Sequence, residues 1–365
     1  MALTDIDGAR LADNAFSLGK NLIINGAMRV AQRGTSSTAS DYGTVDRFST
    51  SYSGGTITTT QEALSSGTPF DEGFRNFVRL TNTSVVTNTA THYRGIYTYL
   101  EGQDIAHSGW NYTSSTSYLT LSFWVRASVS QAYSIRLRTL QGTSQNFPMS
   151  TGTLTADTWT KITKTIPGDS SIGFTNTNGA GLRVDLAPFW GTDYTDSGVS
   201  LDSWAAFSAG TRTQDMTTTW ATTAGATFDI TGVQLEVGSV ATPFEHRSYG
   251  DELRRCQRYY QRIESDGNSD PIGIGYNEGT TEAKVMIDFP VTMRAAPSSL
   301  EQTGTASDYE VRSGSTTNCS SVPVIGPATT NCINIIFILS GLTNSQACQV
   351  RFRISGVFLA WSAEL

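Results

Sequence analysis

The sequence predicts a mostly β protein: an antiparallel jelly-roll β-sandwich, then a short helix, then a second, C-terminal domain that is also β-sandwich-like. Charged residues make up only 16% of the chain, which also contains 34 glycines. Short runs in which apolar and polar residues alternate are separated by Gly-, Ser- and Thr-rich segments, as in antiparallel sheets. The runs are not separated by helices long enough for the crossovers of a parallel α/β fold.

The chain is predicted to divide into four parts, because its 365 residues exceed what one hydrophobic core usually organises. Its first twenty residues hold too few apolar side chains for a core of their own. The predicted parts are an N-terminal segment (1–20), a jelly-roll domain (21–247), a linker helix (248–265) and a C-terminal β domain (266–365).

The strands of the jelly roll are predicted from alternation, which is clearest in residues 118–126 and 133–138. Trp124 lies in the first of these runs and is expected in the core. Residues 227–237 are predicted to form the last strand. Their apolar positions change face once around Thr231 and Gly232, as a bulge requires.

A helix is predicted to leave the sandwich directly after this strand. Ser248 and Asp251 have the spacing of a capping box. Leu253, Cys256 and Tyr259 then follow at helical spacing, so the linker is expected to be helical.

The C-terminal domain contains a strongly apolar run at residues 332–339. Ile335, Ile336, Phe337 and Ile338 follow one another there, so they cannot all face the core of a one-sided sheet. We therefore expect both faces of this strand to be covered, either by a second sheet or by another subunit.

Composition excludes several classes of function. A formal net charge of −7 disfavours general affinity for nucleic acid, which requires a basic surface. No apolar run approaches the length of a membrane span, and residues 1–16 do not have the pattern of a secretion signal. The four cysteines have no metal-ligand spacing, and we expect buried free thiols rather than a zinc site or a disulfide.

Three segments resemble known families. NLIINGAMRVAQRG at residues 21–34 is similar to the opening strand of jelly-roll carbohydrate-binding modules, and residues 233–238 resemble their closing strand, which lies beside the first. ATPFEHRSYGDELRRCQRYY at residues 241–260 resembles bacteriophage tail proteins. The resemblance implies a phage tail-fibre or receptor-binding protein with a carbohydrate-binding-module-like jelly roll.

Partners and location follow from this resemblance. It implies a homotrimer whose residues 1–20 dock on other tail proteins of the virion. It also implies binding to a host-surface polysaccharide, with no catalytic residues and no membrane insertion. Such a protein is assembled in the bacterial cytoplasm and becomes part of the phage tail, so it requires no export signal.

Sugar binding requires planar aromatic rings beside polar groups, because pyranose rings stack their CH faces on them. One segment after residue 185 combines both kinds of side chain and is predicted to be a long loop. The candidate glycan-binding residues are Trp190, Tyr194, Trp204, Asp193 and Asp196, with a second group around Trp110. The alternative is that these tryptophans are buried core residues, as is common in β-sandwiches.

Three further interpretations remain open. The protein could instead decorate a capsid or form a head fibre. It could also be a polysaccharide depolymerase using a carboxylate pair, either Asp185 with Asp193 or Glu101 with Asp104. Jelly-roll sugar binders often hold a structural calcium ion. Its candidate ligands here are Asp46, Glu62, Asp229 and Glu236.

Overall fold

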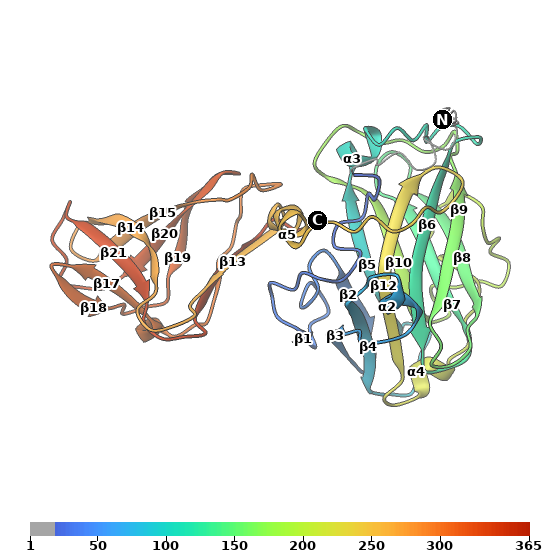
Figure 1. Cartoon of the computed structure of the whole chain (residues 1–365), viewed down its shortest axis with the longest axis horizontal. Coiled ribbons are helices and arrows are strands. Elements are labelled where there is room, and N and C mark those ends of the chain that lie inside the picture. Colours follow the sequence, from blue (N-terminus) through green and yellow to red (C-terminus); the bar gives the residue numbers. More distant parts are fainter. Residues whose placement is uncertain (1–18) are drawn as a thin grey trace, which may run out of the picture.

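A computed structural model describes residues 19–365 and confirms that the chain is mostly β. Figure 1 shows two β units joined through a helix, with the C-terminus returning to the junction between them. Nearly all of the predicted virion-docking segment 1–20 lies outside the described residues. Within residues 19–365, no helix has the length and apolarity needed to cross a membrane.

The first unit is a sandwich of two antiparallel sheets. The strands of one sheet, in spatial order, are β1 (Ser36–Ser37), β3 (Thr56–Ala63), β4 (Asn76–Ser84), β12 (Thr227–Val237), β6 (Tyr118–Ala127) and β9 (Thr160–Pro167). Those of the other sheet are β11 (Ala205–Ala206), β8 (Gln145–Thr153), β7 (Ala132–Thr139), β10 (Ala180–Trp190), β5 (Tyr93–Glu101) and β2 (Ser49–Ser53). Short helical turns lie between strands at α2 (Thr68–Asp71), α3 (Gly102–Ala106) and α4 (Thr219–Thr222).

The facing sides of the two sheets bury one continuous core. Leu121 and Val125 on β6 contribute to it from one sheet, and Leu137 on β7 and Val184 on β10 contribute from the other. Trp124 is also buried, as predicted, but packs in a smaller cluster with Phe77. Side chains that alternate with the core residues of β5, β7 and β10 therefore point away from the sandwich.

The predicted bulge in the last strand is confirmed. The register of β12 against β6 shifts between Thr231 and Gln234. Gly232 has a φ of 64°, and a Cβ atom there would approach Phe74 Cζ to 2.6 Å. Only glycine avoids both the left-handed backbone strain and this clash.

Residues 21–34 lie beside the last strand, as the resemblance implied, but they form turns rather than a strand. The Leu22 amide donates to the Leu235 carbonyl at 2.8 Å, and the Val233 amide donates to the Gly26 carbonyl at 2.9 Å. Asn25 has a φ of 61°, and its side chain accepts hydrogen bonds from the Arg29 and Val30 amides. These contacts turn the chain away from the sheet.

The linker helix α5 (Tyr249–Gln257) begins at the predicted cap, because the Asp251 amide donates to Ser248 Oγ at 3.2 Å. It is shorter than the predicted linker. Residues 260–264 form β13 (Tyr260–Glu264), which pairs with the last strand β22 (Phe358–Ser362). The C-terminal unit therefore begins immediately after the helix.

The C-terminal unit also contains two antiparallel sheets around one core. The smaller sheet has the order β13, β22, β16 (Glu301–Gln302). The strands of the larger sheet, in spatial order, are β18 (Ser315–Asn318), β17 (Tyr309–Ser313), β21 (Ala347–Phe352), β14 (Pro271–Glu278), β15 (Glu282–Asp288), β20 (Cys332–Ile338) and β19 (Val324–Ala328). The turn η1 (Ala306–Asp308) directly precedes the strand β17 of the larger sheet.

The apolar run on β20 is covered on one side only within the chain. Ile335 and Phe337 are buried in the core, whereas Ile336 and Ile338 are half-exposed on the outer side. On the neighbouring strands, Ile274 is 78% exposed and Met286 is 66% exposed. The outer side of the larger sheet thus carries an uncovered apolar strip.

All four cysteines are free thiols, as expected. Cys256, Cys319 and Cys348 are buried, and Cys332 is half-buried. Burial raises the pKa of each of the three buried thiols, which keeps them protonated and unreactive.

Two buried carboxylates connect the units at the junction. Glu101, at the end of β5, accepts hydrogen bonds from Arg258 Nε at 2.8 Å and from the Tyr259 hydroxyl at 2.5 Å. Burial alone would raise the pKa of Glu101, but these donors outweigh it and lower the pKa.

The second carboxylate comes from the end of the chain. Glu364 pairs with Arg47, a buried arginine of the first unit, and with Arg33 at 3.3 Å. The Arg47 guanidinium also lies 3.4 Å from the centre of the Tyr259 ring. Each side of the junction therefore supplies one carboxylate to the other, with Arg47 and Arg33 binding Glu364 and Arg258 binding Glu101.

We predict that Glu364→Gln lowers the free energy of unfolding by about 3–5 kcal/mol, because it leaves the Arg47 charge buried without its main partner. Urea unfolding of the full chain measures this. The control is Glu264→Gln, because Glu264 is 45% exposed and pairs with Arg262 at 2.9 Å. That change should cost less than about 1 kcal/mol. If both variants lose the same small amount of unfolding free energy, the junction does not depend on the pair formed by Glu364 and Arg47.

A second prediction concerns Asp46, which is buried beside the junction and accepts a hydrogen bond from the Gln32 amide at 2.9 Å. Burial raises the pKa of Asp46 from 3.8 to about 6, although the Gln32 hydrogen bonds oppose the rise. The folded state therefore binds this proton more tightly than the unfolded state. Its contribution to stability is fully present below about pH 4 and is lost as the pH rises through about 6.

Asp46→Asn removes this titration. The free energy of unfolding of the wild type, relative to the variant, should fall by up to about 3 kcal/mol between pH 4 and pH 7. Urea unfolding at a series of pH values checks the slope. A difference between the two proteins that stays constant over this range would show that Asp46 does not titrate as stated.

Candidate functional site

The outer side of the second sheet of the sandwich carries large polar and aromatic residues in rows across its strands. In one row, Arg138 on β7 lies opposite Arg183 on β10, which lies opposite Tyr99 on β5. The next row aligns Arg136, Asp185 and Tyr97 in the same way. We call these six residues the arginine–tyrosine face: Tyr97, Tyr99, Arg136, Arg138, Arg183 and Asp185.

A buried carboxylate fixes the middle of this face. Asp185 pairs with Arg136 at 2.8 Å and with Arg183 at 2.5 Å. Burial alone would raise the pKa of Asp185, but the two guanidinium groups outweigh it and lower the pKa. Asp185 therefore remains ionised and holds both arginines in place.

Aromatic rings lie against the guanidinium groups. Arg183 lies 3.7 Å from the centre of the Tyr97 ring, and Tyr97 packs edge-on against Tyr99 at 5.2 Å. Arg138 lies 3.4 Å from the centre of the Phe207 ring. Tyr97, Tyr99 and Arg138 are half-buried, so their exposed atoms remain accessible to a ligand.

The loop at residues 191–217 lies over the β8 end of the face. Its strand β11 pairs with β8 through Ala205 and Asn146. From the same loop, Arg212 lies 4.3 Å from the centre of the Tyr194 ring and 4.7 Å from that of Trp190. The loop therefore adds a fourth arginine and further aromatic rings beside the face.

The structure brings part of the predicted glycan site together. Trp190 packs against Tyr194, with ring centres 5.7 Å apart, and against Tyr93 at 5.6 Å. Trp190 is only 4% exposed, so it leaves little ring surface for a sugar, while Tyr194 is half-buried. Asp193 is exposed at the start of the loop, where its amide donates to the Ala90 carbonyl at 3.0 Å.

Trp204 and Asp196 line a cavity of about 430 Å³ together with Asn146 of β8, and the Trp204 ring packs against the core residue Phe147 with ring centres 5.0 Å apart. Trp204 is half-buried, and its indole Nε1 donates to the Pro167 carbonyl at 2.7 Å. Asp196 accepts from the Gly198 amide at 2.7 Å, which is a loop-stabilising contact. These two residues lie apart from the Trp190 cluster within the same loop.

Trp110 does not join this group. It is 3% exposed, packs against Tyr112 and Phe174, and donates from Nε1 to the Ser117 carbonyl at 3.2 Å. Trp110 and Trp190 are buried, as expected if they are core residues of the sandwich rather than exposed sugar-stacking residues. Their part in glycan binding stays a prediction.

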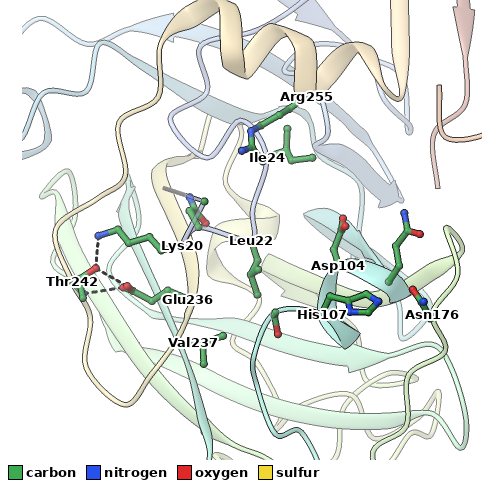
Figure 2. A pocket seen from close by; sticks show the side chains of 14 residues that line it. Lys20, Leu22, Ile24, Asp104, His107, Asn176, Glu236, Val237, Thr242 and Arg255 are labelled. Carbon is green, nitrogen blue, oxygen red and sulfur yellow. Dashed lines mark hydrogen bonds between the residues drawn. The ribbon is translucent and has the colours of Figure 1, made fainter. Parts of the chain in front are cut away.

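A cavity of about 760 Å³ shares no residue with the arginine–tyrosine face. Figure 2 shows Asp104 and His107 on one side and Lys20 and Glu236 on the other, with Thr242 joining the last two. Glu236 accepts from Thr242 Oγ1 at 2.6 Å. No Phe, Tyr or Trp is among its described lining residues, so despite its size it lacks a stacking surface for a sugar.

The candidate calcium ligands do not converge. Asp229 is engaged by Arg79 at 2.8 Å and Arg126 at 2.7 Å, and Glu62 accepts from Thr60 at 2.7 Å. Asp46 and Glu236 are bonded to Gln32 and Thr242. Over residues 19–365 no group of three or more acidic, His or Cys side chains is arranged to hold a metal ion.

Sequence reasoning missed the arginine–tyrosine face. A signal was available, because Tyr97 and Tyr99 alternate with core residues in one strand and Arg136 and Arg138 do so in another. Alternation predicts that each pair points outwards. It does not predict that the two strands lie on either side of β10, which brings the pairs into common rows.

No family model matches the chain, and no curated protein matches its sequence. Among solved structures, the enzymatically active domain of tailspike protein 4 from bacteriophage CBA120 is similar, with a TM-score of 0.32, 10% identity, and coverage of 60% of this chain but 22% of the other. A putative sugar-binding protein from Bacteroides thetaiotaomicron has a TM-score of 0.31 and 12% identity, covering 60% of this chain and all of that protein. A xylan-binding domain of CBM family 22 has a TM-score of 0.29 and 9% identity, covering 59% of this chain and 99% of that domain. Similarities this weak do not identify a ligand.

Proposed function

We propose that this protein is a bacteriophage tail-fibre protein that binds a polysaccharide on the host surface. The observation that carries the binding role is the arginine–tyrosine face. Tyr97 and Tyr99 present half-exposed rings beside the guanidinium of Arg183, and sugars are bound by stacking on rings and by hydrogen bonds from such donors. The tail-fibre role rests on the resemblance of residues 241–260 to phage tail proteins, and docking to the virion is assigned to residues 1–20.

We propose binding without cleavage. Most enzymes that hydrolyse a glycosidic bond use two carboxyl groups that flank it. Asp185 is buried between two arginines, and Glu101 is buried in the junction. Asp104, whose pKa is raised by burial and by Glu101, lines the cavity of Figure 2, but Glu101 does not. Neither candidate pair therefore opens together on one cavity of the described chain.

Capsid decoration is the alternative function, and it would use the same folded units. The two functions differ in where the protein sits on the particle. Electron microscopy of virions labelled with an antibody against this chain distinguishes a tail position from a head position.

We also propose that the fibre is a homotrimer that self-associates through the outer side of the larger C-terminal sheet. Tyr276 and Val324 are also exposed there, and Val324 lies opposite Ile336, so the apolar strip extends over the four strands β14, β15, β20 and β19. A second copy of the chain would cover these side chains. That the assembly contains three chains is inferred from the resemblance to phage tail proteins.

The test of the binding role is the double variant Tyr97→Ala/Tyr99→Ala. Loss of two stacking rings should weaken binding to susceptible cells by tenfold or more, at about 1 kcal/mol for each ring. The matched control is Tyr249→Ala, because Tyr249 is 50% exposed on α5. Adsorption is measured together with the melting temperature.

If the Tyr97→Ala/Tyr99→Ala variant folds normally and adsorbs to cells as the wild type does, the arginine–tyrosine face is not the receptor site. The same assay on Tyr194→Ala/Trp204→Ala would then test the aromatic loop. Release of new reducing ends from the bound polysaccharide would contradict binding without cleavage.

Self-association is tested by Ile274→Lys/Met286→Lys. Each chain of the trimer would then have to bury two lysine charges at the contact, which disfavours assembly. Light scattering should therefore detect monomers at concentrations where the wild type is trimeric. The control is Ile354→Lys, because Ile354 is 44% exposed and lies beyond the end of β21. A trimer that persists in the double variant would place the symmetric contact elsewhere. Deleting residues 266–365 is a weaker test, because it also removes Glu364 and the partner strand of β13.

A further inference from the structure

The arginine–tyrosine face and its covering loop hold four arginines, and the loop also carries the aspartates Asp193, Asp196, Asp202 and Asp215. Arg136, Arg138, Arg183 and Arg212 gather there, and Asp185 is the single carboxylate that pairs with any of them among the described residues. The chain as a whole carries a formal net charge of −7. The face is therefore distinguished by arginines that lack an ion-pair partner within the described part of the chain, and not by a net positive charge.

Arg138 and Arg212 have no carboxylate partner in the described chain. Arg138 Nε donates to Ser144 Oγ at 3.1 Å, and Arg212 Nε donates to the Ala209 carbonyl at 3.2 Å. No terminal nitrogen of either guanidinium makes a hydrogen bond within the described residues. Both groups thus keep the paired donors with which arginine binds an anion.

The four loop carboxylates form no ion pair with these arginines: Asp202 pairs with Lys164 at 3.7 Å, and Asp215 accepts from Thr195 Oγ1 at 2.7 Å. Asp193 and Asp196 are exposed, and the charges that bear most on Arg138 are Arg136 and Arg183. Burial and these like charges lower the pKa of Arg138, and burial with Arg136 lowers that of Arg212 to about 10. An anion between the two arginines would relieve this repulsion.

Buried polar atoms without partners lie under the same loop. Arg136 Nη1, Ser134 Oγ and Asn146 Oδ1 are on outward positions of β7 and β8, and Trp190 Nε1 lies at the end of β10. Each of these residues is less than a tenth exposed. A buried polar atom without a partner costs about 1–3 kcal/mol, so a set of them on one side of one sheet points to a polar ligand.

We infer, on the basis of the glycan-binding function proposed above, that this face selects an acidic polysaccharide. Its sugar rings stack on Tyr97 and Tyr99, and its acidic groups receive hydrogen bonds from Arg138 and Arg212. A carboxylate and a sulfate share the required chemistry, since both are planar or compact oxyanions that arginine binds through two N–H groups.

The test measures binding of the full-length protein to matched probes by calorimetry. The acidic probes are polygalacturonate for carboxylates and dextran sulfate for sulfates. Their neutral counterparts are carboxyl-reduced polygalacturonate and dextran. We expect at least one acidic probe to bind about tenfold or more tightly than its neutral counterpart, with an affinity that falls as salt is added.

The charge variant is Arg138→Gln/Arg212→Gln, which should lose about tenfold or more of the affinity for the acidic probe. Arg138→Lys/Arg212→Lys should retain part of it, because the charge remains. The control Arg254→Gln/Arg353→Gln removes two exposed arginines elsewhere and should bind as the wild type does.

The outcomes separate the two proposals. Equal affinity for acidic and neutral probes, lost in Tyr97→Ala/Tyr99→Ala, would overturn the acid selectivity and leave glycan binding in place. Acidic binding that the control variant loses to the same extent would reflect net charge alone and would also overturn it. Absence of binding to all four probes, with adsorption unaffected by the tyrosine changes, would overturn both.

Discussion

The reciprocal pairing of buried carboxylates and arginines at the junction holds the two β units in one arrangement. Glu101 of the first unit binds Arg258 and Tyr259, while Glu364 at the end of the chain binds Arg47. The cost of desolvating such charges offsets most of their attraction, so the pairs add little net stability. However, a buried charge without its partner is costly. Any other arrangement of the two units would separate these pairs and is therefore unfavourable.

The same strand carries both the junction and the proposed binding site. On β5, Tyr97, Tyr99 and Glu101 occupy successive outward positions, because side chains of a strand repeat every second residue. Arg47, which pairs with Glu364, also donates to the Tyr99 carbonyl at 2.8 Å. The C-terminal unit therefore ends beside the tyrosines, and a disturbed junction should alter the shape of the face as well as the stability of the chain.

Local features of the fold could be predicted from neighbouring residues, whereas most long-range pairings could not. The bulge at Gly232 and the helix cap at Ser248 depend on neighbouring residues, and both are confirmed. Residues 260–264 continued a helical pattern, but pairing with a strand about a hundred positions later prevailed. Trp190 was placed in a loop, yet it ends β10 and is buried, because local sequence does not reveal what covers a residue.

The arginine–tyrosine face, the proposed binding site, shows why a cluster of side chains on a sheet is hard to find in a sequence and is held rigidly once formed. Arg136, Asp185 and Tyr97 come from three separated strands, and only the strand order places the carboxylate between its partners. Since Asp185 fixes two guanidinium groups on a hydrogen-bonded sheet, little conformational freedom is left to lose on binding. The loop at residues 191–217 adds Arg212 and Phe207 above this fixed base. The sheet thus fixes the positions of Tyr97, Tyr99 and Arg138, while the loop adds Arg212, the second arginine of the proposed anion contact.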